Sequence, residues 1–315
     1  MSKTNFYLQN SRWLSITTLL YFSSSFGQTF FIAIFAGEIR QEFAISHTIW
    51  GSIYAIGTLL SAVLMFNFGG LADKWKPREL GTIIIIALAI FCLGMMLVSH
   101  VWFLPILIFG LRFFGQGFVS HLSMVLCGRW FFKNRGKTVA ATSLGFAFGE
   151  ALMPLTFVSL MGWIGWRYSW GIAAILLLLV SFIFRKLLNG ERTPRSAVNS
   201  LNNNIGVGLN GKHWTKGEVL RSWISWPMLL ATMAQSMFVT IFFFQQVHLG
   251  IEKGWNFNQF AILVPVYTLT SIISTFISGI LIDRFGVKHL VPYYLIPGIL
   301  GFIFGSFLSN PLYSI

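Results

Sequence analysis

Two charged residues lie inside long apolar runs and are the first candidates for chemistry. Arg112 lies in the run 102–127 and Glu150 in the run 138–162. A charge at the bilayer centre costs at least about 2.5 kcal/mol on insertion scales, so such residues face the protein interior and pair. In antiparallel neighbouring helices the two charges lie at similar depth, which predicts an ion pair. This pair either locks the two helices together or is functional, with Glu150 taking up a proton and freeing Arg112 to bind an anion.

Uncharged polar residues also occur at mid-depth. The first apolar run carries Tyr21, Ser25 and Gln28, and the Gln28 amide needs partners in a dry setting. Small hydroxyls in such a run also serve helix packing alone. A lone histidine, His121, favours hydrogen-bonded packing over a functional role. Cys92 and Cys127 have no C-x-x-C partner, so we expect neither a disulfide framework nor a metal site, and no cofactor.

A short charged loop occurs twice between apolar runs. Both copies have a glycine, three residues, Asp, then Lys or Arg, and both end on a basic residue. The first runs from Gly69 to Arg78 and the second from Gly279 to Lys288. Repeats that recur in two halves of a chain are typical of transporter folds.

The composition indicates a membrane protein. The chain is 55% hydrophobic and 10% charged, far below the usual quarter of charged residues in soluble domains. The net charge of +13 is gathered in clusters between apolar runs, which favours topology signals over nucleic-acid binding.

Nine apolar runs are long enough to span a bilayer. Their approximate limits are 13–36, 48–71, 80–99, 102–127, 138–162, 167–187, 223–249, 257–281 and 290–309. Of the 22 Lys and Arg, eighteen lie on one side, Arg40, Arg167 and Lys253 lie on the other, and Arg112 lies within a run. The positive-inside rule therefore predicts a cytoplasmic N-terminus in the inner (plasma) membrane. We expect an N-terminal six-helix bundle (1–187), a cytoplasmic linker (188–222) and a partial C-terminal bundle (223–315). Thr215 and Glu218 predict a capping box at the end of the linker. Trp102, Trp163, Trp166, Trp223 and Trp226 lie at helix ends, where interfacial anchoring is the ordinary explanation.

The two loops resemble the signature loop of the major facilitator superfamily, Gly-x-x-x-Asp-Arg-x-Gly-Arg-Lys, found between helices 2 and 3 and more weakly between helices 8 and 9. The first copy departs from it at Lys76 and Pro77. Arg112 to Gly117 resembles the helix 4 motif, and Gly145, Gly149 and Pro154 resemble a degraded helix 5 motif. The resemblance implies an all-α helix bundle with six plus six spans, of which helices 10 to 12 are missing; we expect a truncated chain that is inactive alone.

The resemblance also implies site residues. In the family, helices 1, 4, 7 and 10 line the cavity, and the loop Asp latches onto a helix start in the opposite half. Asp283 then meets the start of helix 5 near Lys137, whereas Asp73 is left with local partners such as Lys74, Arg78 or Arg129. The candidate substrate-binding residues are Tyr21, Ser25, Gln28, Arg112, Gln116, Gln235 and Tyr267, and those for proton coupling are Glu150 and Arg112. The gating residues are Gly69, Asp73, Lys74, Arg78, Gly279, Asp283, Arg284, Gly286 and Lys288.

These observations predict a secondary active transporter that moves a small solute by alternating access. They favour an organic anion as the solute, with its transport coupled to protons. The sequence does not distinguish symport, antiport and uniport. The alternative is a receptor-like protein or an inactive remnant without transport. No Gly-x-x-x-x-Gly-Lys-Ser/Thr loop occurs, and clustered catalytic residues are absent, so we expect neither an ATP-driven pump nor an enzyme. The expected partners are the solute, the proton and the lipid bilayer, with no nucleic acid, and we expect a monomer.

Overall fold

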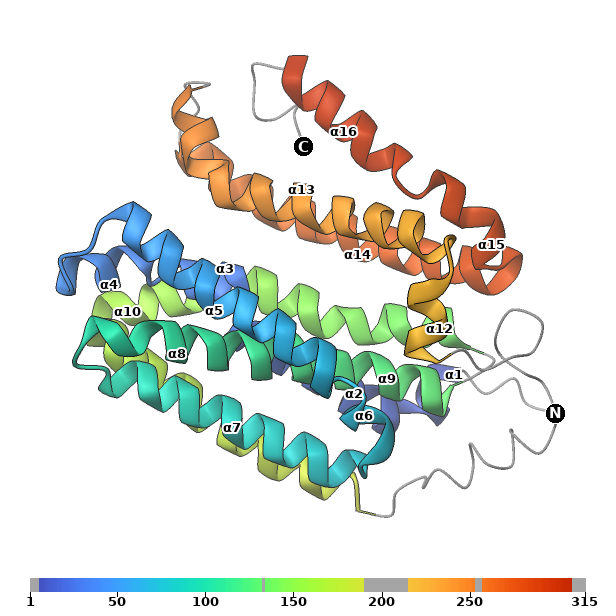
Figure 1. The fold of residues 1–315 in the computed structure, drawn as a ribbon, viewed down its shortest axis with the longest axis horizontal. Coiled ribbons are helices and arrows are strands. Elements are labelled where there is room, and N and C mark those ends of the chain that lie inside the picture. Colours follow the sequence, from blue (N-terminus) through green and yellow to red (C-terminus); the bar gives the residue numbers. More distant parts are fainter. Residues whose placement is uncertain (1–5, 132–133, 190–214, 253–256, 308–315) are drawn as a thin grey trace. The chain divides into compact units, whose positions relative to one another are not determined.

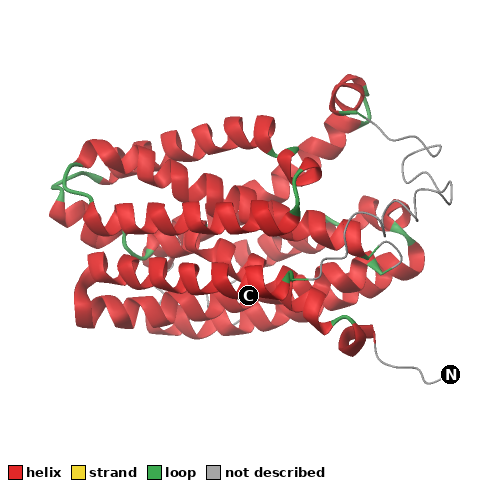
Figure 2. Cartoon of the chain, turned by 90° about the horizontal axis from the view of Figure 1, so that it is seen from below, coloured by secondary structure: helices red, strands yellow, loops and turns green. Residues whose placement is uncertain are grey.

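The computed structural model describes residues 6–131, 134–189, 215–252 and 257–307, and every regular element within them is a helix (Figures 1 and 2). The all-α fold class predicted from the sequence is therefore confirmed. The chain divides into two units, Met1–Glu191 with Ser271–Ile280, and Arg192–Thr270 with Leu281–Ile315. Most of the predicted linker, 188–222, lies outside the described residues. The predicted limits of the two bundles and of the linker between them therefore stay predictions.

The first unit contains helices that match the first six apolar runs. They are α1 (Phe6–Gln9), α2 (Ser11–Ser23), η1 (Ser24–Gly27), α3 (Thr29–Ala33), α4 (Ala36–Glu42), α5 (His47–Phe68), α6 (Leu71–Lys74), α7 (Pro77–Leu97), η2 (Val101–Phe103), α8 (Leu104–Gly110), η3 (Leu111–Val119), α9 (Ser120–Trp130) and α10 (Arg135–Leu187). The predicted first span corresponds to α2 through α3, and the predicted fourth span to α8, η3 and α9.

Local sequence signals explain where several of these helices begin and end. Ser46 caps α5, its hydroxyl accepting a hydrogen bond from the Ile49 amide at 3.2 Å. Pro77 occupies the first turn of α7, where its missing N–H costs nothing. Inside α10, Gly165 adopts φ 80° and ψ 164°, a left-handed conformation that favours glycine. Two helices meet at this kink, so α10 holds both the predicted fifth span and the predicted sixth span.

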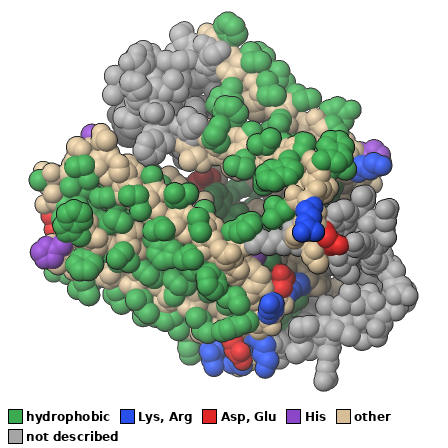
Figure 3. All heavy atoms as spheres, in the orientation of Figure 1, with side chains coloured by type: hydrophobic (Ala, Val, Ile, Leu, Met, Phe, Trp, Pro, Cys, Tyr) green, Lys and Arg blue, Asp and Glu red, His purple; other side chains and the backbone are tan. Residues whose placement is uncertain are grey.

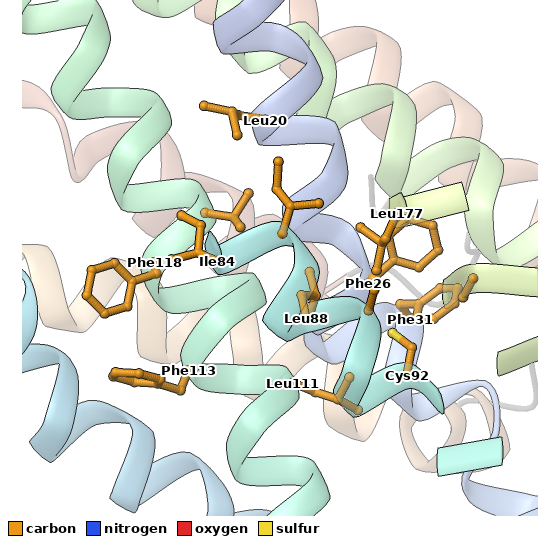
Figure 4. Close-up of a cluster of buried hydrophobic side chains, with 14 of the residues drawn as sticks. Leu20, Phe26, Phe31, Ile84, Leu88, Cys92, Leu111, Phe113, Phe118 and Leu177 are labelled. Atoms are coloured by element: carbon orange, nitrogen blue, oxygen red, sulfur yellow. The ribbon is translucent and has the colours of Figure 1, made fainter. Parts of the chain in front are cut away.

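The interior of the first unit is apolar and closely packed. Figure 4 shows side chains from α2, η1, α3, α7, η3 and α10 in one cluster. Among them, Leu20, Phe26, Leu88 and Leu177 are each at most 1% exposed. Glycines bring the helices of this unit together. A Cβ on Gly145 would lie 2.1 Å from the Thr18 carbonyl oxygen, so α10 and α2 touch backbone to backbone. Such close approach of small residues is the ordinary way in which helices pack in a bilayer.

Large apolar side chains also cover the outside of the described chain (Figure 3). Leu59, Leu97 and Phe182 are 67%, 72% and 69% exposed, a pattern that suits lipid rather than water. Within the described residues, six helices are long and apolar enough to cross a membrane, or seven if the bent pair from Ser11 to Glu42 is one span. One of the six is the 53-residue α10, which holds two predicted spans.

The second unit consists of α12 (Lys216–Arg221), α13 (Ser225–Glu252), part of α14 (Phe257–Phe285), α15 (Val287–Leu290), η5 (Val291–Tyr293) and α16 (Ile296–Phe307). The predicted capping box is confirmed, because Thr215 and Glu218 exchange side-chain and backbone hydrogen bonds at the start of α12. Two contacts join α13 to the segments after α14: the Tyr294 hydroxyl donates to the Ala231 carbonyl, and the rings of Phe238 and Phe302 lie 5.6 Å apart.

Candidate functional site

The first span is broken in its middle, whereas the sequence predicted one continuous run from 13 to 36. α2 gives way to the tight turn η1, Gln28 is extended (φ −83°, ψ 155°), and α3 begins at Thr29. A close crossing accompanies the break. A Cβ on Gly27 would lie 2.1 Å from the Leu111 carbonyl oxygen, and one on Gly115 would lie 2.6 Å from the Gly27 Cα. We call the segment from Gly27 to Thr29 the helix-1 break.

The helix that crosses this break is also irregular. Residues Leu111–Val119 form a π-helix between α8 and α9, and this segment contains Arg112, Gly115 and Gln116. π-helical turns inside α-helices are rare and often occur at functional sites. The two irregular segments meet at the Gly27–Gly115 contact. Three predicted substrate-binding residues, Gln28, Arg112 and Gln116, lie on these two segments.

Arg112 spans the helix-1 break from the other helix. Its Nη1 donates to the Gly27 carbonyl at 3.3 Å and to the Thr29 hydroxyl at 3.1 Å. Tyr54 on α5 completes the arrangement, because its hydroxyl donates to the same Thr29 oxygen at 2.8 Å while its ring lies 5.3 Å from the guanidinium carbon. Arg112 is 7% exposed, and its Nε is buried with no hydrogen-bond partner among the described residues. The guanidinium is thus anchored at one end and unsatisfied at the other.

The predicted ion pair between Arg112 and Glu150 is not formed. Neither Arg112 nor Glu150 takes part in an ion pair with a described residue, unlike Asp73, which pairs with Arg129, and Glu42, which pairs with Arg167. The physical reason is the helix-1 break, which offers Arg112 the Gly27 carbonyl that a regular helix would have used internally. Glu150 is half-buried on α10, within electrostatic range of Tyr21. Arg112 therefore contacts the helix-1 break rather than Glu150.

The other candidate residues differ in how near they lie to this crossing. Gln28 is 8% exposed, and its side chain hydrogen-bonds to no described residue, contrary to the partners expected for it. Ser25 is fully buried against Gly149, its hydroxyl without a partner in the described part of the chain. Tyr21 packs on Phe146 with ring centroids 5.3 Å apart. The Gln116 side chain is half-buried. Tyr267 is half-buried on α14, and the side chain of Gln235 lies outside the described residues.

The first signature loop is tied to the end of α9. Arg129 Nη2 donates to Asp73 Oδ1 at 2.9 Å, which confirms the local partner predicted for Asp73. His121 Nε2 lies 3.2 Å from the Gly69 carbonyl oxygen, in agreement with the hydrogen-bonded packing predicted for it. In the second loop Gly286 adopts φ 78°. Gly279 belongs to the first unit. A Cβ atom on Gly279 would lie 2.8 Å from the Gly136 carbonyl oxygen. The latch role of these residues, and the docking of Asp283 near Lys137, stay predictions.

The opposite end of the first unit, outer by the predicted topology, carries a clamp that sequence reasoning missed. Glu42 accepts hydrogen bonds from Arg167 Nη2 (2.6 Å), from Arg167 Nε (3.0 Å) and from Trp166 Nε1 (2.7 Å). Arg167 also donates to the Met96 carbonyl at 3.0 Å. The hydrogen bonds from Arg167 hold the pKa of Glu42 below its ordinary value. We call Glu42, Trp166 and Arg167 the outer clamp.

Two tryptophans at this end differ from each other. Trp163 is 88% exposed, as expected for an interfacial anchor, but Trp166 is 6% exposed. The anchoring predicted for Trp166 is therefore wrong. Its indole N–H donates a hydrogen bond to Glu42, and the guanidinium carbon of Arg167 lies 4.6 Å from the centre of its ring. The only sequence signal for the clamp was a charged residue, Arg167, in an otherwise uncharged turn.

At the predicted inner end, Arg12 closes the last turn of α10. Its Nε donates to the Leu187 carbonyl at 2.8 Å, and its Nη2 donates to the Leu187 and Asn189 carbonyls. A cation at a helix C-terminus satisfies carbonyls that have no partner in the helix and opposes the negative end of the helix dipole. This contact joins the start of the first span to the end of the sixth.

Apolar spans, exposed hydrophobic sides and a buried arginine at a broken helix define a multi-pass membrane protein. The chain belongs to the Major Facilitator Superfamily, whose family model matches residues 17–315. Members of this family are transporters of small solutes rather than enzymes. A comparison with curated proteins found no match.

Proposed function

We propose that this protein moves a small organic anion across the plasma membrane by alternating access, coupled to protons, and that Arg112 contacts the anion. The observation that carries the proposal is the Nε of Arg112, buried within a span and without a partner among the described residues. A buried donor left unsatisfied costs about 1–3 kcal/mol, and more when charged, so a bound anion relieves a cost that the empty site bears.

Glu150 is the proposed proton carrier. It lies in the same bundle, within electrostatic range of Tyr21, and it makes no ion pair or hydrogen bond with the described residues. Ionisable residues inside spans mark proton relays and substrate pathways, since their burial is otherwise unfavourable. Arg112 and Glu150 then act as separate sites within one bundle: one receives the anion and the other the proton.

The test is uptake of radiolabelled acetate, lactate, succinate and citrate into proteoliposomes, each with and without an inward proton gradient. The sequence predicts a chain that is inactive alone, whereas the buried Nε of Arg112, which has no partner among the described residues, leads us to expect that the wild type accumulates at least one carboxylate. Arg112→Gln is then expected to abolish this uptake, and Glu150→Gln to remove its dependence on the gradient. No accumulation of any carboxylate would favour the inactive remnant instead. Gln116→Leu is expected to lower uptake less, because Gln116 is half-buried beside the crossing. Accumulation of cationic or neutral solutes alone, unaffected by Arg112→Gln, would contradict the proposal.

A further inference from the structure

Arg112 does two jobs with two different parts of its guanidinium group. The Nη1 atom contacts both sides of the helix-1 break, because Gly27 ends η1 and Thr29 begins α3. The Nε atom makes no hydrogen bond with any described residue, and neither does Nη2. In a guanidinium, Nε and Nη2 point their N–H bonds in parallel along one edge, and that edge matches the two oxygens of a carboxylate.

Thr29 and Tyr54 determine which edge of the Arg112 guanidinium is left without a hydrogen-bond partner. The Thr29 hydroxyl oxygen accepts a hydrogen bond from Arg112 Nη1 at 3.1 Å and another from the Tyr54 hydroxyl at 2.8 Å. Tyr54 on α5 thus orients the Thr29 hydroxyl, and the Thr29 hydroxyl in turn orients the Arg112 guanidinium. The Tyr54 ring, 5.3 Å from the guanidinium carbon, restricts the tilt of the plane. Neither residue offers an acceptor to Nε. Three helices therefore hold one arginine in one orientation before any ligand arrives.

We propose that Thr29 and Tyr54 are positioning residues, which with the Gly27 carbonyl hold Nη1 of Arg112 across the helix-1 break and so present the Nε–Nη2 edge to a planar carboxylate. The choice of a carboxylate rests on the proposed function. Because the Arg112 guanidinium is already oriented, less conformational entropy is lost when a ligand binds. The orientation is therefore expected to raise the affinity for the ligand and to leave the turnover rate nearly unchanged. The same contacts hold the two sides of the break together whether or not a ligand is present.

The first experiment needs no ligand. Hydrogen–deuterium exchange is measured at the amides of residues 28–33 in the purified full chain. Thr29→Val removes the shared acceptor at nearly constant volume, and Thr58→Val is its matched control, since the Thr58 hydroxyl is buried with no partner among the described residues. We expect exchange at the break to rise about tenfold in Thr29→Val and in Arg112→Gln, as for loss of a hydrogen bond to a charged group. Equal exchange in Thr29→Val and Thr58→Val would overturn the proposal.

The second experiment separates binding from turnover. Uptake kinetics are measured with whichever of acetate, lactate, succinate and citrate is accumulated most. Thr29→Val and Tyr54→Phe are expected to raise KM about tenfold with kcat changed less than about twofold, because they remove one hydrogen bond that positions a charged group. Arg112→Lys keeps the charge but lacks the two-edged geometry, and is expected to lose uptake. A fall in kcat at unchanged KM in Thr29→Val would indicate a merely structural role and refute the positioning.

The two experiments distinguish the two proposals. If no carboxylate is accumulated by the wild type, the proposed function fails, while the exchange measurement still decides whether Thr29 and Arg112 hold the break. If a carboxylate is accumulated and lost in Arg112→Gln but Thr29→Val behaves as Thr58→Val in both readouts, the proposed function stands and the positioning inference is wrong.

Discussion

Glu42→Gln is expected to destabilise the first unit through the outer clamp. Glutamine keeps the shape of Glu42 but has one acceptor oxygen, and its amide N–H₂ then faces either Trp166 or Arg167, both of which are donors. The ion pair itself contributes little, about 0.2–1 kcal/mol, because the Glu42 side chain is 41% exposed. The larger contribution to the loss of stability comes from Trp166, which is only 6% exposed. Leaving its buried indole N–H without an acceptor costs about 1–3 kcal/mol. We therefore expect a loss of about 1–2 kcal/mol once partial access to water is allowed for.

The two cysteines supply the assay. Cys92 and Cys127 are free and buried in the first unit, so a thiol-reactive fluorophore reports its thermal unfolding. Glu38→Gln is the matched control, because Glu38 lies exposed on the same α4 helix and makes no ion pair with the described residues. Tm is measured for both variants and the wild type in the same detergent. A Tm of Glu42→Gln equal to that of Glu38→Gln would refute the reasoning.

The pH dependence gives a second check on the clamp. The pKa of Glu42 is lowered by its hydrogen bonds from Arg167, relative to an ordinary value of 4.5. A carboxyl group with a depressed folded-state pKa adds stability above its unfolded-state pKa, and this is lost as the pH falls through the folded-state value. The Tm difference between wild type and Glu42→Gln is thus expected to be constant near neutral pH and to shrink below pH 4.5. A difference that grows on acidification would refute this assignment.

Three further predictions concern other contacts of the first unit. Arg12→Ala should lower Tm and speed amide exchange in the last turn of α10, by about tenfold, since charged hydrogen bonds to two carbonyls are lost; unchanged exchange there would contradict it. A double-mutant cycle on Asp73 and Arg129 should give a coupling below about 1 kcal/mol, because Asp73 is 67% exposed; a larger value would mean a buried pair. Gly115→Ala should destabilise strongly, as its Cβ would lie 2.6 Å from the Gly27 Cα, whereas Gly128→Ala, with open space at its Cβ, should be near neutral; equal Tm values would refute the close crossing.

Much of the fold was predictable because apolar length and charge position act locally. Within the described residues, each of the nine predicted spans contains helix, although the first is broken at Gln28. The start of α12 was predicted from two residues, Thr215 and Glu218. The Asp73–Arg129 pair was predictable too, since loop and helix end were expected on the same side of the bilayer. These signals need only the order of residues along the chain.

The site was predicted only in part, because its contacts depend on how the helices pack. Arg112 was singled out by the cost of a charge in an apolar run, but its partner was wrong. The break at Gln28 lies beside the close contact of Gly27 with Gly115, and the periodicity of the sequence shows neither feature. Nothing in the sequence distinguishes Tyr54 from other tyrosines within apolar runs. Its hydroxyl reaches Thr29 only because of how the helices pack.

The turn at Gly165 has a consequence for how the protein is made. One residue with a positive φ joins two helices inside α10, so no segment there is long enough to wait on one side of the membrane while the second helix is synthesised. We therefore expect the fifth and sixth spans to enter the bilayer together, as a hairpin. Glu42 precedes Trp166 and Arg167 in the chain, so it is synthesised before the two residues that contact it. A tag inserted after Gly165 is accordingly expected to block insertion rather than transport.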